Sequence, residues 1–499
     1  MITTDVEPVH TAISSGERRF EEAGRSIGLF LGPAVFLLLL WMPMPTLSAP
    51  AHRLAAVVGF TVVWWATEAV PAPVTALIAT ALAVLLGVAP AQDALAPFAN
   101  PIIFIFLGAF ILARAIAAHN VDGRIARSVL ALPFIRHDLI RSRTALGLLT
   151  LGISAWMNNT ATAAMMTPIA RGILGKGTHS HGGFGTGLML LVGYAASIGG
   201  MLTPVGAGPN LITIGLLESM GGVRVNFVQW MILCVPIALM AMAALLAITT
   251  WLFPLAEPQG ARAAQDVARH TQKWLPGQRN TLVVFGTAVA LWILPGVLAF
   301  TMPDASITKL AGARLDEGVV AIAAACLLFL MPVHWQSRTF TLGWKEAHEI
   351  DWGTLLMFGG GLALGRMMLV TGLAEAIGVT LVRLSGAESL WAITAMAAAV
   401  SIIVTEVMSN TAAIAMLVPV VIGIAQASGI HPVPPAMAVC LGGSFGFIMP
   451  IGTPPNAIVY GTGLIPLRSM MRAGILLDLI GFGIIVGGLR LLCPLLGFV

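Results

Sequence analysis

Two short polar motifs stand within otherwise hydrophobic stretches of the sequence. Residues 157–168 read MNNTATAAMMTP and residues 408–419 read MSNTAAIAMLVP, so that a constant offset of 251 residues pairs Asn159 with Asn410. Amides and hydroxyls can hold the oxygens of an anion, or a small cation, without a fixed counter-charge, and a ligand held in this way can also be released. Such groups placed once in each half of a membrane protein are typical of a binding site at a repeat interface.

The composition is that of a membrane protein. Of the 499 residues, 58% are hydrophobic and only 10% are charged, whereas a soluble domain carries about 25% charged residues. We therefore predict an all-α polytopic protein of the lipid bilayer. Four cysteines lie far apart in apolar runs, which predicts buried thiols rather than a disulfide framework or a metal site. They are Cys234, Cys326, Cys440 and Cys493.

Eleven apolar segments are long enough to span a bilayer, at about 20 residues each. They are 27–45, 52–70, 72–92, 101–118, 186–217, 229–254, 280–300, 318–333, 352–372, 434–464 and 474–497. Two further segments, 144–175 and 388–428, carry the polar motifs in their middle and are predicted to be re-entrant helical hairpins. Broken backbone at membrane depth is tolerated only where protein or a water-filled cavity surrounds it.

This layout divides the chain into two halves, 27–254 and 281–499, joined by a cytoplasmic linker at 255–280. Residues 1–26 form a polar cytoplasmic segment at the N-terminus. With that orientation, 18 of the 26 Lys and Arg residues fall in cytoplasmic segments and 5 in outside segments, as the positive-inside rule requires. The first hairpin then enters from the cytoplasm and the second from outside, so we predict two inverted repeats.

Other matches in the same order support the repeat. The pair Phe106-x-Gly108 recurs as Phe358-x-Gly360, and PVGAGPN at 204–210 recurs as PIGTPPN at 450–456. The general similarity of membrane helices explains shared Leu, Ala and Gly residues. It does not explain the shared Asn-Thr and Pro-Asn pairs.

The glycines and prolines of 203–210 and 450–456 are predicted to break the fifth and tenth spans in mid-membrane. The N–H end of a broken helix favours anions, and its carbonyl end suits Na⁺. We expect both breaks and both hairpin tips to converge, which brings together neutral side chains. They are Asn158, Asn159, Thr160, Ser409, Asn410, Thr411 and Thr453. The alternative, simple helix packing, suits isolated residues such as Thr162 or Ser197 better than the paired motifs.

Few ionisable residues lie near these motifs. Glu406 precedes Ser409 by three residues, and we favour a structural bond to a backbone donor over proton coupling for it. Glu68, between the second and third spans, is interpreted as structural. The sequence shows no nucleophile–base set, no metal-ligand cluster and no phosphate-binding glycine loop, so we do not predict an enzyme, an organic cofactor or a nucleic-acid partner.

At this point the residues resemble a known family, the divalent anion/sodium symporters, over about residues 27–497. Four features carry the resemblance: the WWATEAVP motif at 64–71 with Thr75-Ala76-Leu77, the Asn100-Pro101 pair with Phe106-Leu107-Gly108, the Asp351-Trp352-Gly353 run leading to Phe358-Gly359-Gly360-Gly361, and the two hairpin motifs. The resemblance implies a homodimer in which each eleven-span protomer has a scaffold domain and a transport domain that moves like an elevator.

The resemblance also implies a dianionic substrate carried with Na⁺, and it assigns site residues by position. The first sodium site falls on Ser154, Asn158, Asn159 and the carbonyl of Gly206. The second falls on Thr405, Ser409, Asn410 and the carbonyl of Gly452. Substrate contacts fall on Asn158, Asn159, Thr160, Ser409, Asn410, Thr411, Thr453 and Pro454.

The first half departs from the family pattern twice. Asn158 stands where the family has serine, and Ala207-Gly208 stands where it has a hydroxyl residue and proline. These departures bear on the first sodium site and on the identity of the anion.

The sequence therefore supports a secondary transporter of the bacterial inner membrane for C4-dicarboxylates such as succinate, malate or fumarate, or for citrate, driven by Na⁺. Alternatives are a transporter of sulfate or another inorganic or sulfonated anion, and a sodium-independent anion exchanger. A cation/proton antiporter or arsenite-type pump subunit would place charged residues in the broken helices, and 203–210 and 450–456 have none. A channel or membrane receptor is a more distant alternative.

Overall fold

A computed structural model describes residues 15–136, 138–174, 183–254, 273–386, 389–450 and 452–499. The described chain is mostly helical, and each of the eleven predicted spans contains a helix. By length and composition, seven helices of the described chain could cross a membrane, and five shorter apolar helices accompany them. A multi-pass membrane protein is therefore confirmed, while the number eleven stays a prediction.

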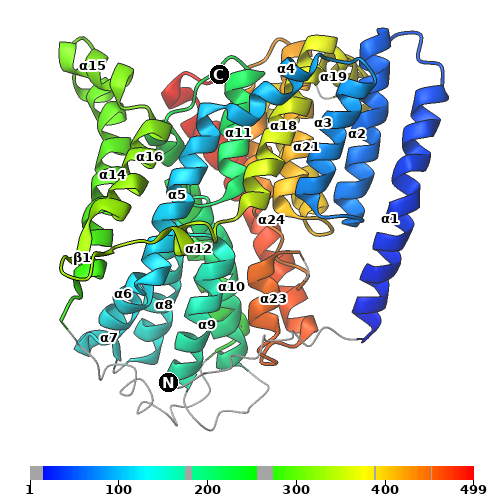
Figure 1. Cartoon of the computed structure of the whole chain (residues 1–499). Coiled ribbons are helices and arrows are strands. Elements are labelled where there is room, and N and C mark those ends of the chain that lie inside the picture. The colour runs from blue at the N-terminus through cyan, green and yellow to red at the C-terminus, as the bar shows by residue number, and fades with distance from the viewer. Residues whose placement is uncertain (1–14, 137, 175–182, 255–272, 387–388, 451) are drawn as a thin grey trace.

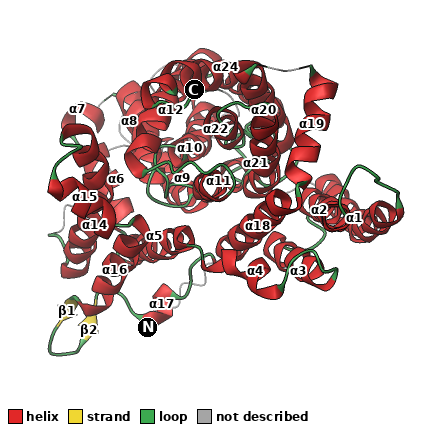
Figure 2. Ribbon diagram, turned by 90° about the horizontal axis from the view of Figure 1, so that it is seen from above, coloured by secondary structure: helices red, strands yellow, loops and turns green. Residues whose placement is uncertain are grey.

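One group of helices flanks the molecule on two sides (Figures 1 and 2). On one side lie α1 (Ser15–Trp41), α2 (Ala49–Thr67), α3 (Ala72–Leu85), α4 (Ala91–Leu95), the 3₁₀ turn η1 (Ala96–Ala99), α18 (Trp352–Thr371) and α19 (Leu373–Ser385). On the other lie α5 (Pro101–Ala118), α14 (Pro276–Thr301), α15 (Ser306–Arg314), α16 (Glu317–Leu330) and α17 (Trp344–Ala347). Within this group α1 packs on α2, α3 on α18, and α5 on α16.

The remaining helices form a central bundle, which is round when seen from above (Figure 2). It contains α8 (Leu139–Ser154), α9 (Asn159–Leu174), α10 (Phe184–Gly200), α11 (Gly208–Ser219), α12 (Phe227–Leu252), α20 (Leu390–Thr405), α21 (Asn410–Ala427), α22 (Val433–Gly442), α23 (Pro454–Tyr460) and α24 (Leu467–Leu492), followed by η2 (Pro494–Leu496). Two short helices, α6 (Val121–Leu130) and α7 (Pro133–Arg136), lead into it. Helix α10 lies at its core, with all residues from Thr186 to Gly200 buried.

Each predicted hairpin segment contains two helices joined by a tight turn, and their re-entrant course in the membrane stays a prediction. The first turns at 155–158, between α8 and α9, and the second at 406–409, between α20 and α21. The predicted breaks are also present, because α10 ends at Gly200 and α22 at Gly442, each well before the next helix starts. We call the connecting segments 201–207 and 443–453 the first and second crossovers; Ile451 lies outside the described residues.

The two hairpins approach the middle of the bundle from opposite ends. In Figure 1, α9 lies in the lower half of the molecule and α21 in the upper half, whereas α11 lies above and α23 below. All four helices therefore begin near mid-height and run away from it. This arrangement agrees with the inverted repeats predicted from the sequence.

Two features differ from the sequence prediction. A two-stranded antiparallel hairpin, β1 (Pro332–His334) with β2 (Thr339–Phe340), follows α16, so the chain is not strictly all-α. Cys326 is exposed, whereas Cys234, Cys440 and Cys493 are buried as predicted. The expectation for Cys326 was wrong because lipid is as apolar as a protein core, so an apolar run does not tell which helix face is buried.

The predicted polar segment 1–26 overlaps the first helix. Helix α1 already begins at Ser15, so residues 15–26 are its first turns rather than a separate element. Residues 1–14, and the part of the linker at 255–272, lie outside the described residues.

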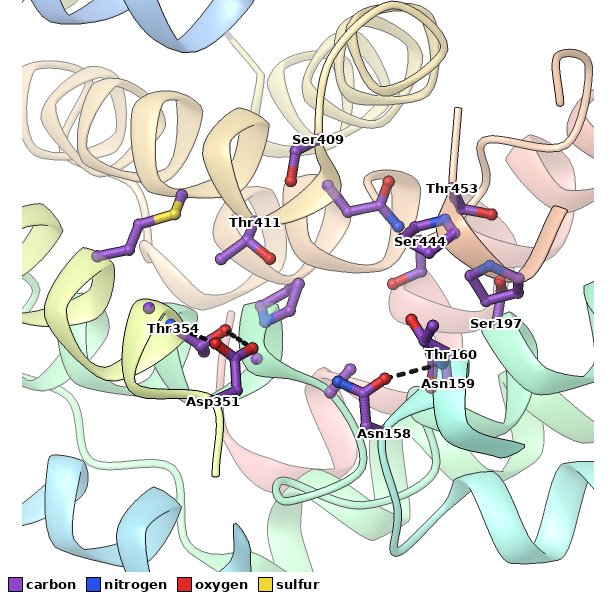
Figure 3. Close-up of a pocket in the computed structure, with 18 of the residues that line it drawn as sticks. Asn158, Asn159, Thr160, Ser197, Asp351, Thr354, Ser409, Thr411, Ser444 and Thr453 are labelled. Carbon is purple, nitrogen blue, oxygen red and sulfur yellow. Dashed lines mark hydrogen bonds between the residues drawn. The ribbon is translucent and has the colours of Figure 1, made fainter. Parts of the chain in front are cut away.

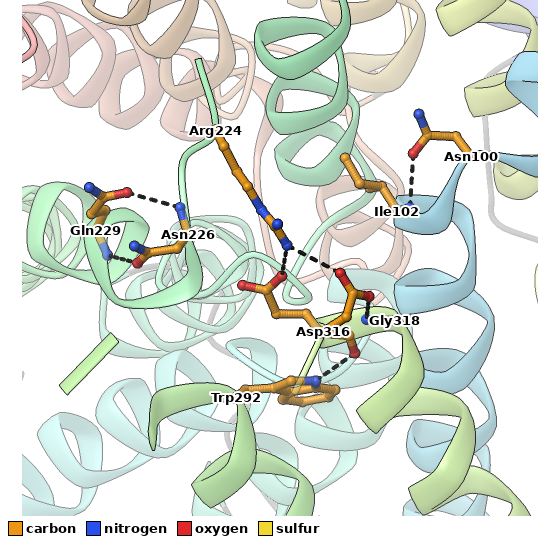
Figure 4. Close-up of polar contacts among 9 residues, drawn as sticks. Asn100, Ile102, Arg224, Asn226, Gln229, Trp292, Asp316 and Gly318 are labelled. Carbon is orange, nitrogen blue, oxygen red and sulfur yellow. Dashed lines mark hydrogen bonds and ion pairs between the residues drawn. The ribbon is translucent and has the colours of Figure 1, made fainter. Parts of the chain in front are cut away.

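An ion-pair cluster links the central bundle to a flanking helix (Figure 4). The guanidinium of Arg224, in the loop after α11, lies 3.2 Å from Asp316 Oδ2 and 3.1 Å from Glu317 Oε2 at the start of α16. Burial lowers the pKa of Arg224, but the carboxylates of Glu317 and Glu218 outweigh it and raise the pKa above its ordinary value. All four side chains line a small cavity of about 220 Å³.

Candidate functional site

A cavity of about 960 Å³ opens between the central bundle and the flanking helices. Both hairpin tips and both crossovers reach it (Figure 3). Its lining includes Asn158, Asn159, Thr160, Gly206, Ala207, Gly208, Pro209, Ser409, Asn410, Thr411, Gly452, Thr453 and Pro454. The four chain breaks expected to converge therefore do so in one cavity.

The tip of the first hairpin is fixed by a buried serine. Ser154, the last residue of α8, donates its hydroxyl toward Asn159 Oδ1 at 2.8 Å and toward the carbonyl of Ala196 at 2.7 Å. Asn159 starts α9 and is half-buried. Ser154 thus ties the tip to α10 behind it and sets the direction of the Asn159 amide.

The second hairpin repeats this arrangement with different residues. Thr405, the last residue of α20, donates toward Asn410 Oδ1 at 2.6 Å and toward the carbonyl of Gly443 at 2.9 Å. Asn410 starts α21, as Asn159 starts α9. The same pair of bonds in both halves supports the repeat at the level of hydrogen bonding.

Each crossover is closed by one buried asparagine. The Asn210 side-chain amide donates to the carbonyl of Gly200 at 2.7 Å and to that of Thr203 at 2.8 Å. The Asn456 amide does the same in the second half, donating to Gly446 at 2.8 Å and to Met449 at 3.2 Å. These bonds supply partners for carbonyls that the helix breaks leave without helical ones.

The two halves differ in how their helix starts are capped. Asn158 Oδ1 accepts a hydrogen bond from Thr160 N at 2.8 Å (Figure 3), so its Nδ2 group is left for other contacts. In the second half, Thr453 caps α23 by accepting from Asn456 N at 3.4 Å. Ala207 has no side-chain oxygen that could accept such a bond, so α11 begins without a side-chain cap.

Three charged side chains line the cavity beside the tips and crossovers. Among the residues that line it, the charged ones are Arg25, Glu68 and Asp351. Arg25 and Glu68 form an exposed ion pair at 3.6 Å. Asp351 caps α18 and accepts from Thr354 N at 3.0 Å and from Thr354 Oγ1 at 2.6 Å. The residues that the hairpin tips and crossovers contribute to the lining are all uncharged.

All eight predicted substrate residues line this cavity, as do the predicted sodium ligands Asn158, Asn159, Gly206, Ser409, Asn410 and Gly452. The other two predicted sodium ligands, Ser154 and Thr405, are fully buried behind the tips. They reach the site through Asn159 and Asn410. Their positions agree with the predicted arrangement, and their roles stay predictions.

Sequence reasoning missed several polar residues of the cavity, among them Thr354, Ser197 and Ser444. Ser197 had been interpreted as a packing residue, yet it lines the cavity and its buried hydroxyl has no hydrogen-bond partner among the described residues. Ser197 and Ser444 occupy matching places in the two halves, because each directly follows the residue whose carbonyl the hairpin hydroxyl binds. A one-residue difference in spacing hid this match in the sequence.

Glu406 has the structural role that we favoured for it. Its carboxylate accepts from Ile448 N at 3.1 Å and from Met449 N at 3.2 Å. It therefore anchors the second crossover to the second hairpin.

Comparison with known proteins decides the family. A profile of the sodium:sulfate symporter transmembrane region matches residues 24–498. The chain belongs to the sodium:sulfate symporter family. The resemblance to divalent anion/sodium symporters is thereby confirmed.

Proteins similar to this chain match it over nearly its whole length. An uncharacterized transporter of Haemophilus influenzae is 33% identical over 453 residues, covering 89% of this chain and 92% of the relative. The sodium-dependent dicarboxylate transporter SdcS of Staphylococcus aureus strain USA300 is 31% identical over 497 residues, covering 93% and 90%. The crystal structure of the Alcanivorax borkumensis YdaH transporter has a similar fold, with a TM-score of 0.54, 15% identity and coverage of 96% and 98%.

Proposed function

We propose that this symporter family member carries small divalent organic anions, C4-dicarboxylates or citrate, across the plasma membrane together with Na⁺. One observation carries the proposal. Two hairpin tips and two crossovers bring uncharged amides, hydroxyls and helix starts into one cavity. Neutral donors can hold two carboxylate groups and still release them, as transport requires.

The donors on the cavity wall suit carboxylate oxygens. Helices α9, α11 and α21 begin at this cavity, and the N–H groups at a helix start carry partial positive charge. The side chains of the two tips, with Thr453 and Pro454, complete the contacts that we assign to the anion. One tip for each carboxylate would explain a preference for dianions.

Sodium ions are assigned to the oxygen-rich side of each tip. The first ion is assigned to Ser154, Asn158, Asn159 and the Gly206 carbonyl. The second is assigned to Thr405, Ser409, Asn410 and the Gly452 carbonyl. All the oxygens offered are neutral, which suits a monovalent cation that has to be released. Na⁺ is thus carried with the substrate and is not a resident cofactor.

The arrangement of the helices supports an elevator mechanism. We assign the central bundle, which holds the site, to the moving transport domain and the flanking helices to a scaffold that forms a homodimer. With the N-terminus in the cytoplasm, the Arg25–Glu68 edge of the cavity faces inward. The inverted repeats then supply the opposite, outward-facing state by exchanging the roles of the two hairpins.

The names of relatives support the substrate class. The Staphylococcus relatives are sodium-dependent dicarboxylate transporters. Sulfate is the second candidate, because the matching family profile is described as a sodium:sulfate symporter region. Both candidates are dianions, so an experiment has to distinguish them.

Uptake into proteoliposomes tests the proposal. We expect saturable uptake of labelled succinate when an inward Na⁺ gradient is applied, with competition by malate, fumarate or citrate. Replacing Na⁺ with K⁺ is expected to abolish uptake, because the gradient supplies the driving force. Sulfate is expected to compete weakly.

The outcomes separate the alternatives. Absence of saturable uptake, and of competition by any di- or tricarboxylate, would rule out the organic substrate class, and strong competition by sulfate would favour the second candidate. Undiminished uptake in K⁺ would indicate sodium-independent exchange. Thermal stabilisation of the purified protein by each anion, measured with Na⁺ or K⁺, gives a readout of binding alone.

Substitution of Asn158 by serine is expected to change selectivity without affecting folding. Serine and asparagine are equally good helix N-caps, so the bond to Thr160 N is kept. The Nδ2 donor is lost, and a hydrogen bond to a charged group contributes about 1.5–3 kcal/mol. We expect a change of roughly tenfold in the preference between succinate and a competing dianion, or in sodium dependence.

A matched control is available for this variant. Asn226 caps α12 by accepting from Gln229 N at 2.9 Å, outside the cavity (Figure 4). Asn226→Ser makes the same chemical change and is expected to leave competition curves unchanged. If Asn158→Ser behaves like this control, Asn158 does not contact the substrate or its ions.

A further inference from the structure

One wall of the cavity contains a serine that neither the tips nor the crossovers supply. Ser197 lies in α10, lines the cavity (Figure 3) and is only 1% exposed. Its Oγ atom has no hydrogen-bond partner among the described residues. Buried polar side chains are nearly always hydrogen-bonded in native proteins, so a hydroxyl that is not requires an explanation.

The hydroxyl of Ser197 does not form the local bond that other hydroxyls of this chain form. Thr213 of α11 donates to the carbonyl of Pro209 at 3.0 Å. Ser444, the counterpart of Ser197 in the second half, donates to the carbonyl of Cys440 at 3.3 Å. Both bonds reach the carbonyl four residues earlier. Ser197 makes no such bond within the described chain, so its hydroxyl is left for a ligand.

The neighbours of Ser197 on α10 locate it between the first hairpin tip and α23. Three residues later, a Cβ atom added at Gly200 would lie 2.5 Å from Asn159 Oδ1. Four residues earlier, a Cβ atom added at Gly193 would lie 2.8 Å from Cγ2 of Val459 in α23. Residues three and four apart share one face of a helix. Ser197 therefore lies on the face of α10 that α9 and α23 both approach.

The two halves of the site supply hydroxyl groups differently. Thr453 brings a hydroxyl to the end of the second crossover, whereas Ala207 occupies the matching place in the first. In the second half the hydroxyl of Ser444 is already bonded. Ser197 therefore offers an unbonded hydroxyl in the half whose crossover ends without one.

The chemistry of a hydroxyl indicates which ligand would satisfy it. A serine hydroxyl has one O–H donor and two acceptor lone pairs. A sodium ion would bind a lone pair and leave the O–H group still without an acceptor. An anion oxygen accepts the O–H group in a charge-assisted hydrogen bond, which is stronger than a bond between neutral groups. The anion is therefore the better ligand for Ser197.

We propose that Ser197 is a further substrate-binding residue, whose hydroxyl donates to an oxygen of the bound dianion. Neighbouring atoms cover the Oγ atom in this state. Contact therefore requires a rotation about the Cα–Cβ bond between staggered positions, while the buried backbone of α10 stays in place. The inference rests on the proposed function, because it needs an anion in this cavity, and it applies to carboxylate and sulfate oxygens alike.

Thermal unfolding of the purified full-length protein tests the inference. Succinate and sulfate are titrated separately at saturating Na⁺, and the rise in unfolding temperature gives the dissociation constant of each. In Ser197→Ala we expect the dissociation constant of the anion that stabilises the wild-type protein to rise at least about tenfold. Stabilisation by Na⁺ alone is expected to stay unchanged. Without ligands the variant is expected to unfold at the same or a slightly higher temperature, because the lost hydroxyl had no partner.

Ser428→Ala is a matched control. Ser428 follows the last residue of α21, and its buried hydroxyl also has no hydrogen-bond partner among the described residues. It lies outside the lining of the cavity. The same chemical change is therefore expected to leave the dissociation constants of both anions and the response to Na⁺ unchanged.

The other outcomes would overturn the inference. An unchanged dissociation constant in Ser197→Ala would mean that the hydroxyl does not contact the anion, and a weaker response to Na⁺ alone would assign it to a sodium site instead. A variant that does not fold would show that the hydroxyl has a structural role. If neither anion stabilises the wild-type protein, the proposed function fails and this inference with it, which differs from failure of the variant alone.

Discussion

Asn410→Ala is expected to abolish transport and to leave the protein folded. Asn410 lies at the second hairpin tip, where its amide lines the cavity and its Oδ1 accepts from Thr405. We expect the initial uptake rate to fall at least about 100-fold, equivalent to about 2.8 kcal/mol of lost binding or transition-state stabilisation. The fold loses little, because the Thr405 hydroxyl can donate to the Gly443 carbonyl instead. We expect a stability cost of about 1 kcal/mol.

Uptake and thermal unfolding, measured on the same preparation, separate the effect of Asn410→Ala on transport from its effect on stability. Thr162→Val is a matched control, because Thr162 lies in α9 and its buried hydroxyl has no hydrogen-bond partner in the part of the chain that the structure describes. This control is expected to keep full uptake and to unfold at the same or a slightly higher temperature. Full activity of Asn410→Ala would show that the second hairpin is only structural.

The largest effect on folding is expected for Gly206→Ala, in the first crossover. A Cβ atom there would lie 2.6 Å from the carbonyl oxygen of Gly200 and 2.9 Å from that of Ala155. Neither backbone group can retreat easily, since Asn210 holds the first and Thr203 binds the second. Overpacking against side chains destabilises a protein by about 1–3 kcal/mol. We expect a clash with rigid backbone to destabilise it by more. We expect loss of folded protein or of all transport.

The second crossover offers the corresponding comparison. At Gly452 an added Cβ would lie 3.3 Å from the Gly446 oxygen and 3.4 Å from the Met449 oxygen, which small shifts can relieve. Gly452→Ala is therefore expected to yield folded protein, with a stability loss below about 1 kcal/mol. Yield of monodisperse protein and its unfolding temperature measure the difference. Equal behaviour of both variants would contradict the asymmetry of the two crossovers.

Much of this site could be predicted because its chemistry conflicts with its surroundings. Amides such as Asn159 and Asn410 are expensive in an apolar segment, so their repetition was informative. Glycine and proline at 203–210 and 450–456 stop helices for local steric reasons, which made the breaks predictable. The hairpins and the convergence of the tips followed from these two facts.

Other features depend on contacts that the sequence does not reveal. Thr354 reaches the cavity because α18 packs beside α11, and nothing in its local sequence marks it as a site residue. The exposure of Cys326 depends on which face of α16 meets lipid.

The asparagines that close the crossovers have a consequence for how the ligand is selected. Asn210 and Asn456 each clamp a loop into a closed ring, so the rim of the site is preorganised before any ligand arrives. Ordering of the protein on binding then costs little conformational entropy. A rigid rim favours dianions whose two negative charges are separated by the distance that the site offers. Selectivity among dianions would follow from their length more than from the strength of any single contact.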